Sequence, residues 1–447
     1  MSSAQLAVPA SPSSSKRSRS RDSSRSGTAS SINTPSASTP FITPSASAPS
    51  LIIPTNSETA STAEQSPQDA TPYPAFLRSD LANWEAEVQS KFVDLEWEQR
   101  RRVAQGAIEK DAEPPSQWAR CGGNEVQSRN RYANVDPYQS NRVKLKVPEG
   151  HSDYINASPI VLQSTKSGTV TKFIATQGPK NDTLSHIWRM VWYETKSPAV
   201  IVMLTQTHES GREKCFPYYP RSPSSPSLPV NENDEFEDGF KHTVRLKTLT
   251  ENEETRAQIR ELMMANEDGS ETREVWHLLF GGWPDFLVPE GADRIALLNL
   301  IELSRSKNLD NAENPRIIHC SAGVGRSGTF IALDWLLQEL EEGSLDDVDD
   351  EDDPIVTIVD ILRQQRMMMV QGEPQFAFLY EVVRERWRDR WAKLHPEEAE
   401  ELGLGALHEP VPKKQKSGNE GEGDEDERAQ LEAELIDAEM DFENGKS

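Results

Sequence analysis

The sequence predicts an α/β domain built around a mixed β-sheet, and two stretches of the chain carry this prediction. In the first, strand-like runs at Lys172–Thr176 and Ala199–Leu204 stand on either side of an amphipathic helical stretch, Leu184–Glu194. In the second, the apolar run Arg316–Ile318 leads through a loop of small residues into the helical run Ile331–Leu337. Strands and helices that mix in this way are typical of an α/β domain.

The remaining elements follow from the same patterns. Ordered structure is expected to begin near Phe76, and further helical patterns occur at 80–89, 91–108 and 376–393. Two polar insertions interrupt the pattern at 221–238 and 346–353. The first is rich in Ser and Pro before it becomes acidic, and the second is almost entirely acidic. Both are expected to form surface loops.

Composition divides the chain of 447 residues into three parts. Residues 1–75 are dominated by Ser, Thr, Ala and Pro, a composition that cannot bury a core, so they predict a disordered tail. Residues 76–395 form the expected folded domain. Residues 396–447 hold 17 acidic and 5 basic residues and predict an acidic, mostly disordered tail, in which 426–442 has the pattern of a short helix.

The bulk properties of the chain exclude several classes of protein. A net charge of −25 argues against nucleic-acid binding, which needs a basic face. No apolar run approaches the ~20 residues that span a bilayer, and the N-terminus lacks a signal-peptide pattern. The cysteines number three, an odd count without metal-like spacing, which fits a reducing compartment better than a disulfide framework. The sequence therefore predicts an intracellular protein without a membrane span.

The N-terminal tail has two interpretations. It contains a basic cluster, Lys16–Arg21, and six Ser-Pro or Thr-Pro pairs between Ser11 and Thr71. One interpretation is a solvated linker whose pairs follow from composition alone. The other is a tail that proline-directed kinases modify and whose basic cluster serves nuclear entry or docking.

The most specific signal is the stretch His319–Phe330, in which five small residues separate a cysteine from an arginine. A strand, a small-residue loop and a helix start are what a phosphate cradle needs, because glycines let backbone N–H groups converge on one point. We call the segment Cys320–Arg326 the cradle. Its backbone N–H groups are expected to bind the phosphate, and they belong to Ser321, Ala322, Gly323, Val324 and Gly325.

Three side chains of this stretch have a predicted chemical role. A thiol reacts as the thiolate, and a helix start together with Arg326 favours the anion at Cys320. The alternative, a buried structural cysteine, does not explain why the whole string occurs together. Arg326 offers a planar fork to two phosphate oxygens. Ser327 has two compatible roles, stabilising the sulfur as a leaving group and capping the helix.

A nucleophile that attacks phosphorus also needs an acid for the leaving oxygen. Trp283-Pro284-Asp285 supplies a candidate, because the preceding glycines give hinge freedom and Pro284 stiffens the turn that holds Asp285. An aspartate in a loop is more often an ordinary turn residue, so this role depends on the presence of the cradle.

Two further loops complete the predicted site. Gln371 and Gln375 carry amides four residues apart that can position the water needed to break a phosphocysteine, although loop glutamines are usually only solvated. In Asn130–Val135, Tyr132 is a candidate aromatic wall that selects substrates by depth, with Asn134 beside it as a substrate contact. Taken alone, Tyr132 would read as a core residue.

These residues give the chain its resemblance to a known family. Residues 76–395 resemble the cysteine-based, tyrosine-specific protein tyrosine phosphatases, and the absence of a membrane span and of a second such domain resembles their non-receptor members. The matching motifs, in chain order, are Asn130–Tyr132, Asp153–Ser158, Gln177–Pro179, Lys214–Cys215, Trp283–Asp285, His319–Gly328, and Gln371 with Gln375.

The resemblance implies a single domain with a highly twisted mixed sheet flanked by helices, and a two-step hydrolysis of phosphotyrosine in proteins. Cys320 attacks phosphorus while Asp285 protonates the tyrosine oxygen. Asp285 then acts as a base for a water held by Gln371 and Gln375. The resemblance implies no metal or organic cofactor.

The resemblance also assigns supporting roles. Glu209 matches the acidic residue that orients Arg326, and Lys214 matches the lysine that approaches the loop bearing Asp285. His319 matches the histidine that tunes the thiolate.

Three departures from the family pattern are expected to affect access rather than chemistry. Leu287 stands where many relatives have glycine in the acid loop, and Met368 stands where a small residue often lies near the pocket rim. Ala133 removes a charge often found beside the recognition tyrosine.

Two other functions compete with an active tyrosine phosphatase. A pseudo-phosphatase that binds phosphotyrosine without turnover is disfavoured because Cys320, Arg326 and Asp285 are all present. A dual-specificity or lipid phosphatase shares the cradle but generally lacks the tyrosine at position 132. The proline-directed sites and the basic cluster favour signalling partners such as mitogen-activated kinases and a cytoplasmic location with access to the nucleus.

Overall fold

The computed structural model of the chain describes residues 73–78, 84–284, 287–346, 348–349 and 352–402. The helices in these ranges are η2 (Ala75–Leu77), α1 (Trp84–Ile108), α2 (Asn124–Arg129), η3 (Asn181–Thr183), α3 (Leu184–Glu194), α4 (Gly291–Lys307), α5 (Gly325–Glu342), α6 (Pro354–Gln365), α7 (Glu373–Leu394) and α8 (Pro396–Glu401). None of these described helices is both long and apolar enough to cross a membrane.

The strands form a mixed sheet, as the sequence predicted. They are β1 (Ala157–Gln163), β2 (Val170–Thr176), β3 (Ala199–Met203), β6 (Ser227–Val230), β7 (His242–Asn252), β8 (Ala257–Asn266), β9 (Thr272–Phe280) and β10 (Arg316–His319), with a separate short hairpin of β4 (His208–Glu209) and β5 (Arg212–Glu213). The order across the sheet is β1-β2-β10-β3-β9-β8-β7-β6. The central pairs, β2 with β10, β10 with β3 and β3 with β9, are parallel, and the outer pairs are antiparallel.

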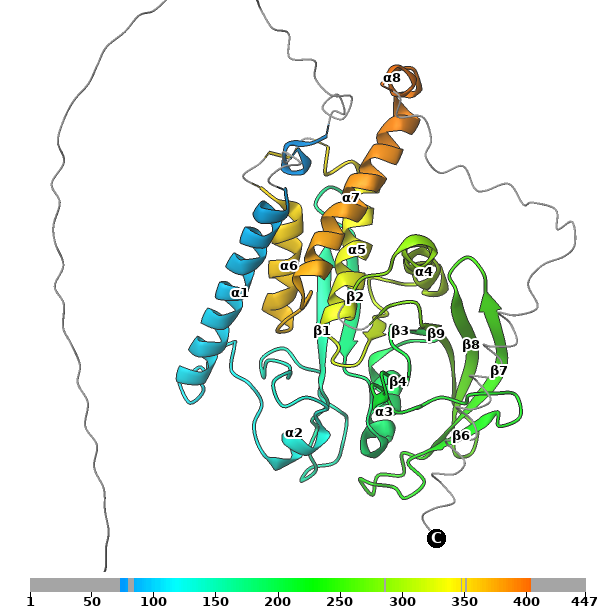
Figure 1. Cartoon of the computed structure of the whole chain (residues 1–447). Helices are drawn as coiled ribbons and strands as arrows, with labels where there is room; N and C mark the ends of the chain where they lie inside the picture. The colour runs from blue at the N-terminus through cyan, green and yellow to red at the C-terminus, as the bar shows by residue number, and fades with distance from the viewer. Residues whose placement is uncertain (1–72, 79–83, 285–286, 347, 350–351, 403–447) are drawn as a thin grey trace, which may run out of the picture. The chain divides into compact units, whose positions relative to one another are not determined.

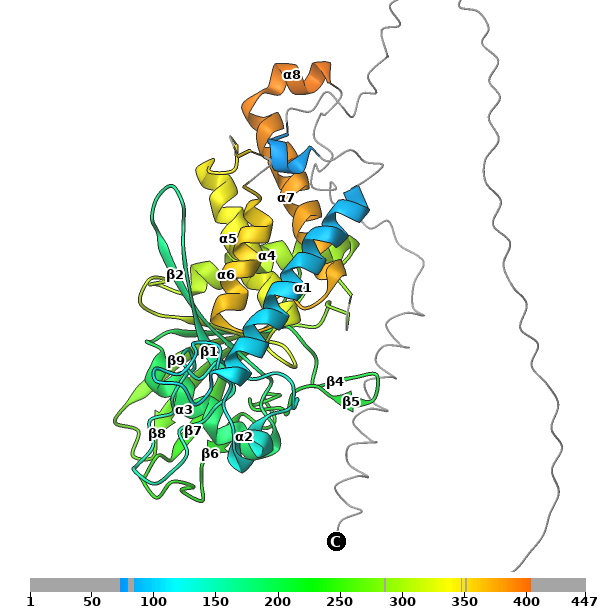
Figure 2. The same ribbon diagram turned by 90° about the vertical axis from the view of Figure 1, so that its left-hand side faces the viewer.

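Helices cover both faces of this sheet (Figures 1 and 2). Along the fully buried strand β3, alternate side chains enter different cores. Val200 and Val202 belong to the larger core, which includes side chains of α1, α4, α5, α6 and α7, whereas Ile201 and Met203 belong to the core beneath α3. The carboxyl ends of the parallel strands therefore lie between two helical layers.

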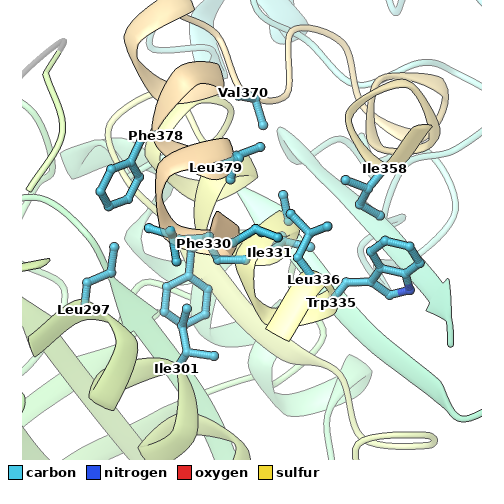
Figure 3. Packing of buried hydrophobic residues seen from close by; sticks show 14 of the residues in the cluster. Leu297, Ile301, Phe330, Ile331, Trp335, Leu336, Ile358, Val370, Phe378 and Leu379 are labelled. Carbon is cyan, nitrogen blue, oxygen red and sulfur yellow. The ribbon is translucent and has the colours of Figure 1, made fainter. Parts of the chain in front are cut away.

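Helix α5 lies at the centre of the larger core, and Figure 3 shows its apolar side chains enclosed by neighbouring helices. Phe330 and Leu336 of α5 are fully buried. Leu297 and Ile301 of α4, Ile358 of α6 and Phe378 and Leu379 of α7 surround them. The helix that follows the cradle is thereby fixed by packing along its length.

Helix α1 differs from the two helical stretches expected at 80–89 and 91–108, because it is continuous from Trp84 to Ile108. Residues 79–83 lie outside the described part. Val88, Phe92 and Leu95 are buried at helical spacing on both sides of the expected break at Ser90. This unbroken apolar face keeps the helix intact.

The two polar insertions are not simple surface loops. Within 221–238 the chain forms β6, which pairs with β7 at the sheet edge, and Phe236 is buried beneath the acidic part. Within 346–353, Asp353 is buried, and its carboxylate accepts hydrogen bonds from the backbone N–H groups of Ile355 and Val356 at the start of α6. Residues 347, 350 and 351 lie outside the described part.

The predicted tails lie mostly outside the described residues, including the expected short helix at 426–442 and all the proline-directed sites between Ser11 and Thr71. Helix α8 falls within the segment 396–447 that the sequence assigned to the acidic tail, and its Ala399 is buried against the larger core.

Candidate active site

The cradle joins the end of β10 to the start of α5, at the carboxyl edge of the parallel strands. Gly323 has a left-handed φ of 74°, and a Cβ placed there would lie 2.1 Å from the carbonyl oxygen of Thr176. Only glycine therefore lets the loop pass this close to β2. Within the described residues, the backbone N–H groups of Ser321, Ala322 and Val324 make no hydrogen bond to protein acceptors, which leaves them available to an anion.

The sulfur of Cys320 lies at the base of this loop. The residue as a whole is 5% exposed. Its Sγ accepts a hydrogen bond from the backbone N–H of Gly323 at 3.3 Å. The sulfur is thus placed among the same N–H groups that would bind the oxygens of a phosphate.

Arg326, in the first turn of α5, is held by two other loops. Its Nη1 and Nη2 donate to Oε1 and Oε2 of Glu209 at 2.6 and 2.8 Å, and Nη1 also donates to the carbonyl of Leu204. Burial raises the pKa of Glu209, but the hydrogen bonds and charge of Arg326 outweigh it, so the net pKa is lowered and the pair stays ionised. Glu209 lies on the short β4–β5 hairpin that follows β3. This hairpin brings a residue that is distant in sequence beside the Arg326 guanidinium.

His319 is fully buried and connects Cys320 to the interior through two polar contacts. Its Nδ1 lies 3.1 Å from the carbonyl oxygen of Cys320, and its Nε2 lies 2.7 Å from the hydroxyl of Tyr218. Burial lowers the pKa of His319 to about 4, so the ring is neutral at physiological pH.

Tyr132, the predicted recognition residue, lies beside the cradle in the segment 130–135, which we call the recognition loop. The hydroxyl of Tyr132 is 2.8 Å from Oγ of Ser321, and Ser321 in turn donates to the carbonyl of Lys214. Lys214 is buried, whereas Asn134 is exposed at the surface of the recognition loop. The loop itself is anchored because the backbone N–H of Arg131 donates to Gln177.

The two glutamines also converge on the cradle. A Cβ placed at Gly325 would lie 2.9 Å from Oε1 of Gln375 and 3.3 Å from Cβ of Gln371. Gly328 permits this approach, since a Cβ there would lie 2.4 Å from the backbone nitrogen of Val370. Gln371 is exposed, and Gln375 is buried and accepts a hydrogen bond from the backbone N–H of Gly372.

Ser327 does not cap helix α5, because the capping position is Val324. Its hydroxyl is buried and finds no hydrogen-bond partner among the described residues. The capping role considered for Ser327 is therefore wrong.

Asp285, the expected acid, and Phe286 lie outside the described residues. On their two sides, Trp283 is buried and donates from Nε1 to the carbonyl of Leu287 at 3.0 Å. Pro284 and Leu287 are exposed. The structure therefore describes both ends of the acid loop but not its central residue.

The three residues that depart from the family pattern lie in different surroundings. Met368 is half-buried and packs against Trp118, Tyr138 and Met367, with a left-handed φ of 60°. Its neighbours are therefore core residues. Ala133 is exposed on the recognition loop, as is Leu287 on the acid loop.

Arg366 is a residue of the site that the sequence did not single out. It is fully buried and donates from Nε and Nη2 to the cradle carbonyls of Gly323 and Ala322. Its other bonds reach Asn156 and Ser158, so it ties the cradle to β1. A single buried arginine does not change the apolar periodicity of a sequence. The one sequence signal that could have identified Arg366 was its position two residues before Met368.

The fold and the site together define a class: an α/β domain with a cysteine-based anion cradle at the carboxyl edge of its parallel strands. A family model described as protein-tyrosine phosphatase matches residues 126–385, and the chain belongs to this family. This agrees with the family resemblance of its motifs.

Curated relatives share this region. Tyrosine-protein phosphatase 2 of Schizosaccharomyces pombe is 35% identical over 267 residues, which cover 58% of this chain and 34% of the relative. Tyrosine-protein phosphatase non-receptor type 2 of Rattus norvegicus is 36% identical over 261 residues, which cover 58% of this chain and 56% of the relative. The chain thus spans little more than half, or less, of the length of these relatives.

Solved structures show the same fold. The catalytic domain of human protein tyrosine phosphatase non-receptor type 18 is 30% identical, with a TM-score of 0.52 and coverage of 68% of this chain and 96% of that one. A structure of the type 18 protein in complex with HER2 phosphopeptides is 29% identical, with a TM-score of 0.56 and coverage of 69% and 96%.

Proposed function

We propose that this protein hydrolyses phosphotyrosine in proteins through a phosphocysteine intermediate, and that residues 76–395 form its catalytic domain. One observation carries the proposal: the Cys320 sulfur lies beneath backbone N–H groups of Ser321, Ala322 and Val324 that have no acceptor among the described residues, and the Arg326 guanidinium is held in place by Glu209. A phosphate bound there meets a nucleophile, N–H donors and a planar cation at once.

In the first step, Cys320 attacks phosphorus, the bond to the tyrosine oxygen breaks, and Asp285 donates the proton that this oxygen takes up. Trp283 and Pro284 position the loop that carries the acid, and Lys214 approaches it. Arg326 and the cradle N–H groups stabilise the charge that develops on the phosphate oxygens.

In the second step, a water attacks the phosphocysteine and Asp285 takes its proton. Gln371 and Gln375, which lie against Gly325, hold this water. Ser327 is suited to stabilise the departing sulfur, since its buried hydroxyl has no other described partner. His319 fixes the carbonyl of the nucleophile.

Selection for tyrosine is assigned to the depth of the pocket, with Tyr132 as its wall and Asn134 as a contact to the peptide. The complex of the type 18 protein with HER2 phosphopeptides supports phosphotyrosine peptides as the substrate class. The same recognition loop argues against a dual-specificity or lipid phosphatase, and intact Cys320 and Arg326 argue against a pseudo-phosphatase.

The test is hydrolysis of phosphotyrosine peptides by the purified full chain, without added metal. Cys320→Ser should abolish turnover, and Asp285→Ala should slow turnover while leaving the peptide bound. Turnover that survives the cysteine change, or that requires a metal, overturns the mechanism. Preference for phosphoserine or lipid substrates overturns the assigned specificity.

The cellular role is proposed on the sequence alone. The proline-directed sites and the basic cluster support a role in signalling, modification by proline-directed kinases, and mitogen-activated kinases as partners. We place the protein in the cytoplasm with access to the nucleus. Substrate trapping with Asp285→Ala followed by mass spectrometry tests the partners, and recovery of unrelated phosphoproteins only would exclude these kinases.

A further inference from the structure

Arg260, on β8, is a buried cation that the proposed reaction does not use. It is 4% exposed, and its described hydrogen bond is a single donation from Nη2 to Oε1 of Gln258 at 2.8 Å. Its Nε and Nη1 are buried without a partner among the described residues. Its guanidinium lies 4.5 Å from the centre of the Tyr219 ring. A buried charge that has no carboxylate partner among the described residues is costly, so its presence calls for a physical reason.

The residue directly opposite Arg260 in the neighbouring strand is His277 of β9. Opposed residues of an antiparallel pair share one face of the sheet, with their Cβ atoms about 5 Å apart. The ring of Tyr219 also lies against His277 in a tilted arrangement, with centroids 4.3 Å apart. Among the described residues, Nδ1 of His277 is buried without a hydrogen-bond partner, as are Nε and Nη1 of Arg260. These three nitrogens thus belong to two residues that lie opposite each other in neighbouring strands.

His277 begins a hydrogen-bond chain that reaches the nucleophile. Its Nε2 lies 3.1 Å from the Tyr218 hydroxyl, which lies 2.7 Å from Nε2 of His319. Nδ1 of His319 lies 3.1 Å from the carbonyl oxygen of Cys320. All of these groups are buried.

The donor and acceptor roles in this hydrogen-bond chain follow from its last member, the carbonyl of Cys320. A carbonyl only accepts, so Nδ1 of the neutral His319 carries the proton and its Nε2 must accept from the Tyr218 hydroxyl. That hydroxyl has then given its one proton, so Nε2 of His277 must donate to it.

A neutral His277 with its proton on Nε2 has a bare lone pair on Nδ1. Burial, and after it the positive charge of Arg260, holds the pKa of His277 well below its usual value, so the ring is neutral. In a poorly polarisable interior, a nearby cation favours a lone pair over a proton on a ring nitrogen that has no partner among the described residues.

We propose that Arg260 is a positioning residue for the phosphatase reaction: its charge holds His277 with the proton on Nε2, and this reinforces, at the far end of the hydrogen-bond chain, the direction that the Cys320 carbonyl requires. Donation into one nitrogen of His319 makes the other N–H a stronger donor. The peptide between Cys320 and Ser321 is planar, so a carbonyl held in place also fixes the Ser321 N–H, one of the cradle donors that have no acceptor among the described residues.

The test compares tautomers and activity in the full chain. Heteronuclear NMR of protein with isotope-labelled histidine distinguishes protonated from bare ring nitrogens, and His277→Gln assigns the relevant signal among the 8 histidines. The wild type should show His277 protonated on Nε2 and His319 protonated on Nδ1. Finding His277 protonated on Nδ1 in the wild type overturns the proposal without any variant.

Arg260→Met should let part of the His277 population carry its proton on Nδ1 and should lower kcat/KM for a phosphotyrosine peptide by about five- to tenfold, the size of one lost polarised hydrogen bond. Arg260→Lys keeps the charge, so this variant should show the wild-type tautomer of His277 and the wild-type kcat/KM. The matched control is Arg273→Met, which removes another arginine of the same sheet, one that lies 5.2 Å from the Trp192 ring.

An unchanged His277 tautomer in Arg260→Met, or a loss of activity no larger than that of Arg273→Met, refutes the positioning role. The effect on activity rests on the proposed function, whereas the tautomer does not. A wild type that lacks phosphatase activity but shows the expected tautomers would therefore contradict the proposed function alone.

Discussion

Glu209 holds Arg326 through two parallel hydrogen bonds of 2.6 and 2.8 Å, so the guanidinium is fixed before any phosphate arrives. Glu209→Gln keeps the shape but removes the charge and one of the two acceptors. We expect kcat/KM for a phosphotyrosine peptide to fall about 10- to 100-fold, because a hydrogen bond to a charged group contributes about 1.5–3 kcal/mol. Steady-state kinetics measures this.

The matched control for this change is Glu213→Gln on the same hairpin. Glu213 pairs with Arg131, and its side chain is 41% exposed, so its loss should change kcat/KM by less than about threefold. Equal losses of kcat/KM in the two variants would show that the effect comes from disturbing the hairpin and not from losing the hydrogen bonds between Glu209 and Arg326.

Gly323→Ala should destroy the cradle. The residue has a φ of 74°, and the added Cβ would meet the Thr176 carbonyl at 2.1 Å, so the loop has to move away from β2. We expect loss of turnover and a lower free energy of unfolding, measured by denaturant titration. Gly269→Ala is the control, because Gly269 has a φ of 70° with no atom near its Cβ position.

The control change should cost only the ~1–2 kcal/mol of a left-handed residue. If Gly323→Ala were no more damaging than Gly269→Ala, the close approach to β2 would have no functional importance.

The sequence predicted those parts of the structure that depend on residues close to one another along the chain. The string from His319 to Phe330 lies in one strand, one loop and one helix start, so its geometry follows from the neighbouring residues. The mixed sheet and α3 were likewise predicted from apolar periodicity.

Contacts between distant segments were not predictable in this way. Arg366 reaches the cradle, and Tyr218 reaches the adjacent His319, from far along the chain. Neither carries a periodic signal, because one buried polar residue does not alter a pattern. Asp353 was assigned to a surface loop because its neighbours are acidic, yet Lys91 and Tyr380 hold its carboxylate in the interior. Glu209 was found only through the family resemblance.

Gln371→Ala should separate the two chemical steps. If this amide holds the water of the second step, the first turnover stays fast while steady-state turnover falls about 10- to 100-fold. Stopped-flow measurement with p-nitrophenyl phosphate should then show a burst of product. The control is Gln364→Ala, since Gln364 is exposed on α6 and bonds Asp360. A variant that slows without a burst would place Gln371 in the first step.

His242 should make the folded protein sensitive to acid. Its ring lies between Trp192 and Phe240, with centroids 4.4 and 4.1 Å away, and neither nitrogen has a partner among the described residues. Burial, and after it the charge of Arg189, lowers the pKa of His242 from 6.5 to about 4. Between these values the unfolded chain binds a proton that the folded protein does not, so stability is lost as the pH falls through this window.

His242→Phe removes the titrating group and keeps an aromatic ring between the same neighbours. Urea unfolding at about pH 7.5 and about pH 5 should therefore show a smaller loss of stability in the variant than in the wild type. The other buried histidines of the described residues, His186, His277 and His319, are the same in both proteins, so the difference in stability loss reports on the His242 ring alone. An identical loss in the two proteins would mean that His242 is protonated as readily when folded as when unfolded, and that the aromatic enclosure does not exclude the charge.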